Sequence, residues 1–258
     1  MLTAIRSGLF QLFSYLWTGL LVILYLPFLG RPRRRLQPLG AFWCRGVLVL
    51  ARVFCGIRWR ATGRENLSPG PVIIAAKHQS EWDGLIFHIL LSDPVYVLKR
   101  ELMQVPMFGL YLSRLGNIGI DRAAGFRAIK QMLPVVRERL DEGAQVIVFP
   151  EGTRVPPGTR QPYHPGIAAL YQRCDVPLVP VALNSGVFWR RSVFRRCPGT
   201  ITIEFLAPMP RGLDRDAFLA ELTMQIETAT DRLCGSAGTT EPLPQAPAAF
   251  PVEPGESL

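Results

Sequence analysis

The stretch VIIAAKHQSEWD, residues 72–83, decides the fold. Five apolar residues open it, which is the pattern of a short strand buried on both faces. Pro69-Gly70-Pro71 sets it off from what precedes, and a polar run begins where the strand would end. Further along the chain, apolar runs of strand length alternate with helical periodicity. The sequence therefore predicts an α/β fold with a single mixed sheet flanked by helices.

The expected elements follow from apolar periodicity and from turn residues between them. Strands are predicted at residues 72–76, 95–98, 117–120, 145–149, 178–183 and 200–206. Helices are predicted at residues 83–91, 102–115 with a break near Pro106, 124–140, 166–174 and 214–233.

An uncharged apolar segment, Leu9 to Leu29, precedes this region. As a helix it would be about 31 Å long, enough to cross the hydrocarbon core of a bilayer. The arginines that follow, Arg31 and residues 33–35, favour the cytoplasmic side and anionic lipid headgroups. No small-residue cleavage site follows, so the segment is read as a membrane anchor and not as a signal peptide.

A second apolar segment, Ala41 to Ile57, contains Arg45 and Arg52, which share one helix face and suit an interfacial helix. Residues 31–40, with two prolines, are expected to form the turn between the segments. One full span and a re-entrant hairpin both remain open. We expect membrane-anchoring helices over residues 1–60, the α/β domain over 61–234, and a disordered Pro-rich tail over 235–258.

The net charge of +9 is unevenly distributed. Residues 1–64 hold ten arginines and no acidic residue, whereas the other 194 residues are nearly neutral, with 19 basic and 20 acidic side chains. A nucleic-acid-binding domain is not indicated, because its charge should lie on the folded domain. The five cysteines are scattered, so neither a metal site nor a disulfide framework is expected.

His78 and Asp83 follow the first predicted strand, where α/β sheets place ligands. An Asp hydrogen-bonded to one ring nitrogen would leave the other nitrogen free to act as a base. Five residues on a regular helix would separate the pair by about 140°, so the segment must turn for the two to meet. With no GxSxG elbow in the chain, the pair suits activation of a substrate hydroxyl.

Two further polar blocks follow predicted strands. Phe149-Pro150-Glu151-Gly152-Thr153-Arg154 combines a glycine turn, a hydroxyl and a guanidinium, which can hold a phosphate, while Glu151 would orient neighbouring donors. Gly116-Asn117-Ile118-Gly119-Ile120-Asp121-Arg122 offers Arg122 as a second cation. Lys99 also follows a strand. Strand alternation would point Lys77 to the face opposite His78.

Together these blocks resemble the lysophosphatidic acid acyltransferases of the bacterial PlsC type, in the glycerolipid acyltransferase superfamily. Residues 78–83 match the family's H-x4-D block, 116–122 its G-x-x-x-I-D-R block, and 149–154 its F-P-E-G-T-R block; residues 176–181 resemble its fourth block. The likeness covers roughly residues 40–233. It departs at residues 163–166, Tyr-His-Pro-Gly, where the family commonly has Lys before Pro-Gly, and this leaves the acceptor headgroup open.

The resemblance implies transfer of a fatty acyl group from acyl-CoA or acyl-carrier protein to the sn-2 hydroxyl of 1-acylglycerol-3-phosphate at a membrane surface. His78 would be the base and Asp83 its partner, without a metal or bound cofactor. The acceptor phosphate site is assigned to Arg122, Glu151, Gly152, Thr153, Arg154 and Lys99, with Glu151 supporting the loop. Another lysolipid, such as a lyso-ornithine lipid, is the alternative acceptor. A non-catalytic protein that binds anionic lipids is the alternative from another class.

Overall fold

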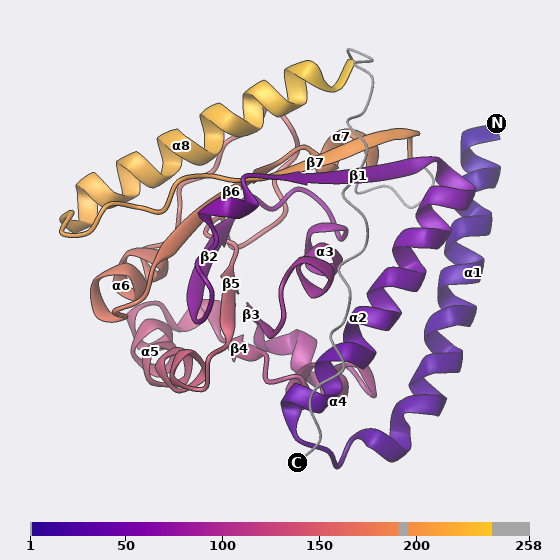
Figure 1. Cartoon of the computed structure of the whole chain (residues 1–258), viewed down its shortest axis with the longest axis horizontal. Helices are drawn as coiled ribbons and strands as arrows, with labels where there is room; N and C mark the ends of the chain where they lie inside the picture. The colour runs from indigo at the N-terminus through magenta and orange to yellow at the C-terminus, as the bar shows by residue number, and fades with distance from the viewer. Residues whose placement is uncertain (1, 191–195, 239–258) are drawn as a thin grey trace.

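A seven-stranded mixed sheet forms the centre of the chain in the computed structural model, which describes residues 2–190 and 196–238 (Figure 1). The strand order is β1-β7-β6-β2-β5-β3-β4, and β6 and β7 are antiparallel while the other neighbours are parallel. The strands are β1 (Ile57–Thr62), β2 (Val72–Ala76), β3 (Pro94–Lys99), β4 (Ile118–Ile120), β5 (Gln145–Val148), β6 (Leu178–Leu183) and β7 (Gly199–Phe205). The predicted fold class is confirmed.

The middle of the sheet is the segment from which the fold was predicted. All five residues of β2 are buried, and β2 pairs in parallel with β5 on one side and β6 on the other. A strand covered on both faces needs an unbroken apolar run, which is what residues 72–76 supply. The carboxyl ends of β2, β3, β4 and β5 consequently meet at one edge of the sheet.

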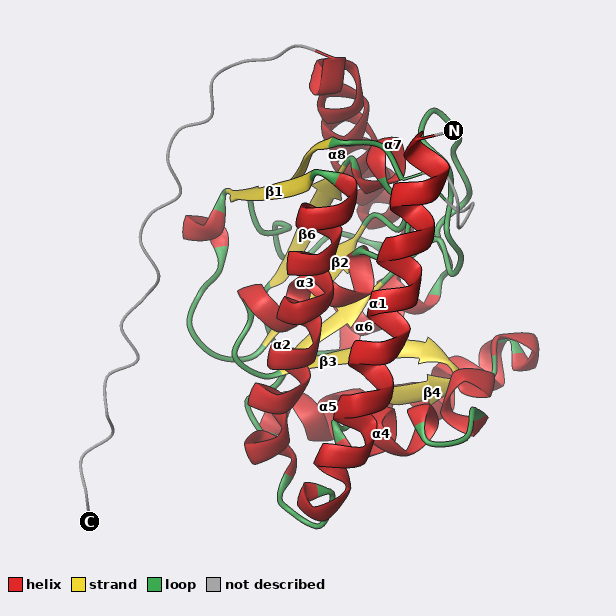
Figure 2. Cartoon of the chain, turned by 90° about the vertical axis from the view of Figure 1, so that its right-hand side faces the viewer, coloured by secondary structure: helices red, strands yellow, loops and turns green. Residues whose placement is uncertain are grey.

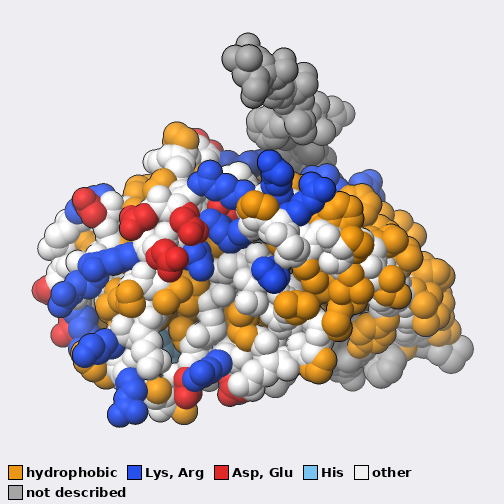
Figure 3. Space-filling view, turned by 90° about the horizontal axis from the view of Figure 1, so that it is seen from below, with side chains coloured by type: hydrophobic (Ala, Val, Ile, Leu, Met, Phe, Trp, Pro, Cys, Tyr) orange, Lys and Arg blue, Asp and Glu red, His pale blue; other side chains and the backbone are white. Residues whose placement is uncertain are grey.

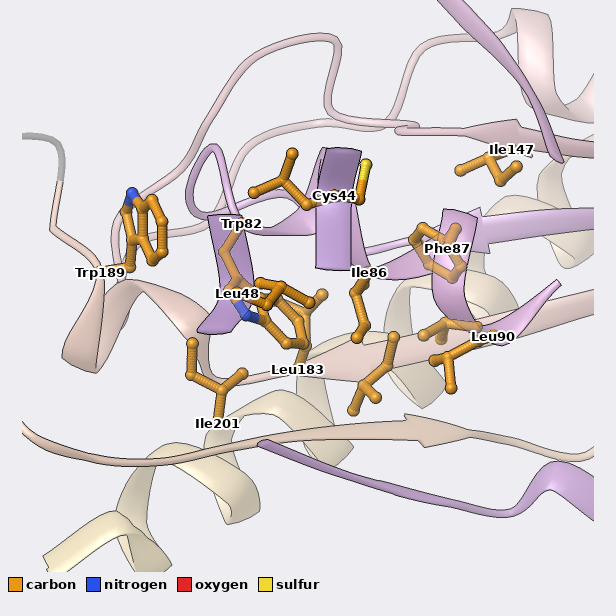
Figure 4. Close-up of a cluster of buried hydrophobic side chains, with 14 of the residues drawn as sticks. Cys44, Leu48, Trp82, Ile86, Phe87, Leu90, Ile147, Leu183, Trp189 and Ile201 are labelled. Atoms are coloured by element: carbon orange, nitrogen blue, oxygen red, sulfur yellow. The ribbon is translucent and has the colours of Figure 1, made fainter. Parts of the chain in front are cut away.

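Helices cover both faces of the sheet. One buried cluster joins α2 and α3 to Val72 and Ile74 of β2, and Figure 4 shows part of it. The other joins α5, α6 and α8 to Ile73 and Ala75, so alternate residues of β2 serve the two faces. The helices are α1 (Leu2–Tyr25), α2 (Arg33–Leu50), α3 (Asp83–Leu90), α4 (Phe108–Arg114), α5 (Phe126–Asp141), α6 (Gly166–Arg173), α7 (Ser185–Phe188) and α8 (Arg215–Gly235).

The two N-terminal helices form an antiparallel hairpin that lies along the sheet (Figure 2). Both are long and apolar enough to cross a membrane by length and composition. They approach closely at Gly46, where an added Cβ would lie 2.3 Å from the Trp17 indole. The Trp17 indole donates to the Trp43 carbonyl, and the Trp43 indole donates to the Thr18 hydroxyl. These contacts hold α1 and α2 together as a hairpin, and α2 packs on the domain behind it through Cys44, Val47 and Leu48.

The turn of this hairpin is shorter than predicted. Residues 31–40 were expected to be a turn, but α2 already begins at Arg33 and carries Pro38 within it. Tertiary contacts outweigh the helix-breaking tendency of proline here. Arg33 lies 2.5 Å from the Asp93 carboxylate, and the buried Gln37 amide donates to the same carboxylate at 2.8 Å.

The expected boundary at residue 60 also needs adjustment, because it falls inside β1. This strand pairs in parallel with β7 over its whole length, so the sheet begins at Ile57 and not at residue 61. At the other end, α8 continues to Gly235 and a 3-10 turn to Gly238. The rest of the predicted tail lies outside the described residues.

Replacing Asp93 with Ala should destabilise the protein, because it strips Arg33 and Gln37 of a shared, mostly buried acceptor. Breaking a buried charge pair costs about 3 kcal/mol, which lowers Tm by roughly 6–12 °C for a domain of this size. Thermal unfolding in detergent measures this. Asp175→Ala is the matched control, since that carboxylate pairs with Arg211 while 91% exposed. Equal Tm values for the two variants would show that the contacts of Arg33 and Gln37 with Asp93 do not stabilise the fold.

Candidate active site

His78 and Asp83 meet at the carboxyl end of β2. The His78 Nδ1 lies 2.9 Å from the Asp83 Oδ2, and the Asp83 side chain is fully buried while that of His78 is 19% exposed. With Nδ1 directed at the carboxylate, Nε2 is the ring nitrogen left for substrate. The pair thus has the geometry of a base and the group that orients it.

A tight turn brings the two residues together. The Asp83 Oδ2 accepts hydrogen bonds from the backbone N–H groups of Gln79, at 2.6 Å, and Ser80, at 2.8 Å. These bonds fold residues 78–83 back on themselves, and α3 begins at Asp83. The predicted need for a turn is therefore met by the carboxylate itself.

The loop after β5 packs against His78. The Phe149 ring stacks on the His78 ring with centroids 4.0 Å apart, and the Val155 N–H donates to the His78 carbonyl at 2.8 Å. Gly152 has φ +67°, and a Cβ there would lie 2.6 Å from the His164 ring. Both the backbone conformation and the space therefore require glycine in this turn.

Three cations gather beside this loop. Arg122, after β4, donates to the Gly152 carbonyl; Arg154 pairs with Glu81; and Lys99 lies 3.0 Å from Glu101 on the surface. The sheet order explains the gathering, because β3 and β4 lie next to β5. The predicted phosphate-site residues Lys99, Arg122, Gly152, Thr153 and Arg154 line one cavity together with His78.

Glu151 is placed differently from the other residues assigned to the phosphate site. It is 1% exposed, and its carboxylate is turned into the interior, where the Oε2 accepts from the His78 N–H at 2.9 Å and the Oε1 lies 2.6 Å from the Lys77 Nζ. Burial raises the pKa of the Glu151 carboxyl, and the Lys77 ammonium acts in the opposite direction. This position fits support of the loop and not contact with a phosphate.

The cavity that contains His78 has a volume of about 720 Å³. Beyond the polar end its walls are apolar and come from α1, α2, α3 and α4, with Leu21, Leu36, Trp43, Leu85 and Phe108 among them. A site with an apolar body and a few converging polar groups is suited to an amphiphile.

His88, on α3, forms part of the apolar wall. Burial lowers its pKa to about 4, so the imidazole is neutral and does not break the apolar lining. Within the described residues, no group of three or more His, Cys, Asp or Glu side chains is arranged to hold a metal ion.

Sequence reasoning missed the acidic partner of Lys77. As predicted, Lys77 points away from the cavity, but there it meets Glu227 of α8 at 2.8 Å, and the Tyr163 hydroxyl donates to the same carboxylate. A local signal existed: Glu227 borders the buried stripe of α8, next to Ile226. Its partner lies 150 residues away, and no local pattern indicates that pairing.

Comparisons with known proteins agree with this geometry. Residues 58–184 match the family model described as Acyltransferase. The chain is 36% identical over 230 residues to a 1-acyl-sn-glycerol-3-phosphate acyltransferase of Pseudomonas aeruginosa, covering 87% of this chain and 88% of that protein. It is 30% identical over 204 residues to the human 1-acyl-sn-glycerol-3-phosphate acyltransferase alpha, covering 78% of this chain and 71% of that protein.

The fold also has a solved counterpart. The crystal structure of the 1-acyl-sn-glycerophosphate acyltransferase PlsC from Thermotoga maritima superposes with a TM-score of 0.68, covering 89% of this chain and 97% of that one, at 20% identity. That likeness concerns the fold alone. Together with the Pseudomonas relative, which the chain matches over most of its length, it confirms the family resemblance seen in the sequence blocks. The chain belongs to the acyltransferase family and is an enzyme of that class.

Proposed function

We propose that this enzyme transfers a fatty acyl group from an acyl thioester to the free sn-2 hydroxyl of 1-acyl-sn-glycerol-3-phosphate, giving phosphatidic acid. One observation carries the proposal: His78, with Nδ1 held by Asp83, shares a cavity with Arg122, Arg154 and a long apolar wall. The cavity thus offers a base, cations for a phosphate and room for an acyl chain. The names of the relatives point to the same acceptor.

In the proposed reaction, His78 Nε2 takes the proton of the acceptor hydroxyl as its oxygen attacks the thioester carbonyl. Asp83 stabilises the imidazolium that forms. Collapse of the tetrahedral intermediate breaks the C–S bond, and the imidazolium returns the proton to the leaving thiolate. The thioester, acyl-CoA or acyl-carrier protein, is a co-substrate, and the route uses no metal and no resident cofactor.

The acceptor phosphate would lie among Arg154, Arg122 and Lys99, over the turn at Gly152 and Thr153. In the described structure Arg154 is neutralised by Glu81, whose other oxygen accepts from the Trp189 indole at 3.0 Å. A phosphate would therefore compete with Glu81 for the guanidinium, which can hold either group through two N–H bonds.

We further propose that the N-terminal hairpin seats the domain on the cytoplasmic face of a membrane rich in anionic lipids. Large apolar side chains of α1 are exposed, among them Leu12 at 53% and Ile23 at 68%. Figure 3 shows hydrophobic side chains gathered over the α1 side of the molecule, with Lys and Arg beside them. Exposed Leu102, Phe108 and Leu110 extend the apolar surface to α4, which contacts α1 through the Tyr111 hydroxyl and the Val22 carbonyl.

The substrate assignment is tested with purified enzyme in detergent, each donor type and a panel of acceptors, with products separated by headgroup. We expect phosphatidic acid from 1-acylglycerol-3-phosphate to dominate. A preference for a lyso-ornithine lipid or another lysophospholipid would replace the proposed acceptor, and zero turnover across the panel would overturn the proposed reaction.

His78→Ala should lower turnover by roughly 10³-fold or more, because general-base assistance and the oriented proton transfer are both lost. Steady-state rates with saturating acceptor measure this. The His78 side chain is 19% exposed and lines the cavity, so co-sedimentation with vesicles should equal that of the wild type. Acyl transfer near the wild-type rate by this variant would rule out the proposed pair.

Arg154→Ala should raise KM for the phosphorylated acceptor by roughly 10- to 100-fold, the loss of about 1.5–3 kcal/mol in a charge-assisted hydrogen bond. The kcat value should change much less. Arg160→Ala is the matched control, since Arg160 pairs with Asp231 on the surface and is 65% exposed. An unchanged KM for Arg154→Ala would remove this arginine from the phosphate site.

Arg31→Gln combined with Arg35→Gln should weaken binding to anionic vesicles by roughly 30-fold, at about 1 kcal/mol for each exposed arginine near the surface. Both side chains are exposed at the hairpin turn. Binding to vesicles of neutral lipid serves as the reference and should not change. An equal loss on both kinds of vesicle would show that the arginines act through the fold.

A further inference from the structure

A buried ionic cluster lies behind the proposed catalytic pair, on the opposite side of the end of β2. It consists of Lys77, Glu151 and Glu227, which are 1%, 1% and 3% exposed, and of the Tyr163 hydroxyl. The Lys77 ammonium donates to both oxygens of Glu227, at 2.8 and 2.9 Å, and forms an ion pair with Glu151 at 2.6 Å. The mechanism above uses none of these groups as an acid, a base or a ligand.

The cluster is costly to bury, because one ammonium faces two carboxylates. Replacing a buried ion pair with well-packed apolar side chains is often neutral or even stabilising, so a gain in stability does not account for it. What such a cluster supplies well is a defined position, since Lys77 is fixed from two directions while the Tyr163 hydroxyl holds the Glu227 carboxylate.

The position that the cluster defines is that of His78. Lys77 is the residue before it, and the second oxygen of Glu151 accepts from the His78 N–H at 2.9 Å. Phe149, two residues before Glu151, stacks on the His78 ring, and Gly152 follows Glu151 directly. Glu227 on α8 is therefore linked to both segments that carry the site.

We propose that Glu227 is a positioning residue for the acyl transfer: through Lys77 and Glu151 it fixes the backbone of His78 and the turn that carries Phe149 and Gly152. The inference rests on the proposed role of His78. A displacement of about 1 Å at a reacting group can cost on the order of 100-fold in rate, so a residue that never touches substrate can still limit kcat.

The test separates position from stability with a variant that lacks the Lys77–Glu227 ion pair. In the double variant Lys77→Met with Glu227→Leu, both charges of the pair are replaced by apolar groups of similar size. We expect its Tm to fall, because the buried Glu151 carboxylate and the Tyr163 hydroxyl lose their partners. We also expect kcat per folded molecule to fall by roughly 10- to 100-fold and KM for lysophosphatidate to stay within about twofold. A purely structural role would move Tm and leave kcat per folded molecule unchanged.

A second variant covers the case in which the double variant does not fold. Glu227→Gln keeps the shape of the side chain and an acceptor for the Tyr163 hydroxyl, but weakens its hold on Lys77. We expect a smaller loss of kcat, of about threefold to tenfold, again with KM nearly unchanged. Glu221→Gln is the matched control, because it removes a carboxylate from the same helix that contacts Gln225 and not the cluster.

Wild-type kcat in a folded double variant, or in Glu227→Gln, would overturn the inference, as would an equal loss in Glu221→Gln. Failure of the proposed function looks different, because there the wild-type enzyme would not acylate lysophosphatidate or His78→Ala would keep its activity. The inference about Glu227 fails alone when turnover depends on His78 and not on Glu227.

Discussion

The parallel pairing of β2 with β5 is the constraint on which the site depends. The pairing begins with Val72 opposite Gln145 and ends with Ala75 opposite Val148, so the segments that follow the two strands leave the sheet side by side. His78 and Phe149 can stack only because this register brings the ends of the two strands together. With β3 and β4 next in order, Lys99 and Arg122 arrive at the same edge. Residues that are up to 76 positions apart thus become one site through strand order alone.

Alternation along a strand then places neighbouring side chains at the end of β2 in different surroundings. Successive side chains point to opposite faces, and this continues past the last paired residue. His78 faces the cavity, whereas Lys77 faces the interior and α8. The two neighbours differ in surroundings for that reason: one side chain is open to an amphiphile, and the other is locked among buried carboxylates. Stacking by Phe149 and the buried contacts of Glu151 connect the two sides again through the loop after β5.

The features that could be predicted from sequence are those decided by short-range pattern. Buried strands such as residues 178–183 are unbroken apolar runs, and the site blocks follow directly at strand ends. The features that could not be predicted depend on distant partners. β1 alternates arginines with apolar residues and resembles the end of an interfacial helix until β7 supplies its neighbour. Pro38 would end a helix on local grounds, but contacts from Gln37 and Arg33 to Asp93 and burial of Cys44 and Val47 hold α2 in place around it.

In the basic N-terminal quarter, such distant contacts decide how many of the arginines are exposed to bind anionic lipid. Ten arginines without an acidic residue suggest a uniform attraction to anionic lipid. In the fold, part of that charge is not available to lipid. Arg33 forms ion pairs with Asp93 and Glu142, and Arg6 is held by a hydrogen bond to the Phe54 carbonyl. Arg31 and Arg35 stay exposed at the hairpin turn. Because α1 and α2 also wall the cavity that holds His78, the helices that we propose to face lipid on one side shape the site on the other. In the proposed function, seating on a membrane and binding of an acyl chain are therefore coupled through one hairpin, and a change in how the hairpin packs would alter both.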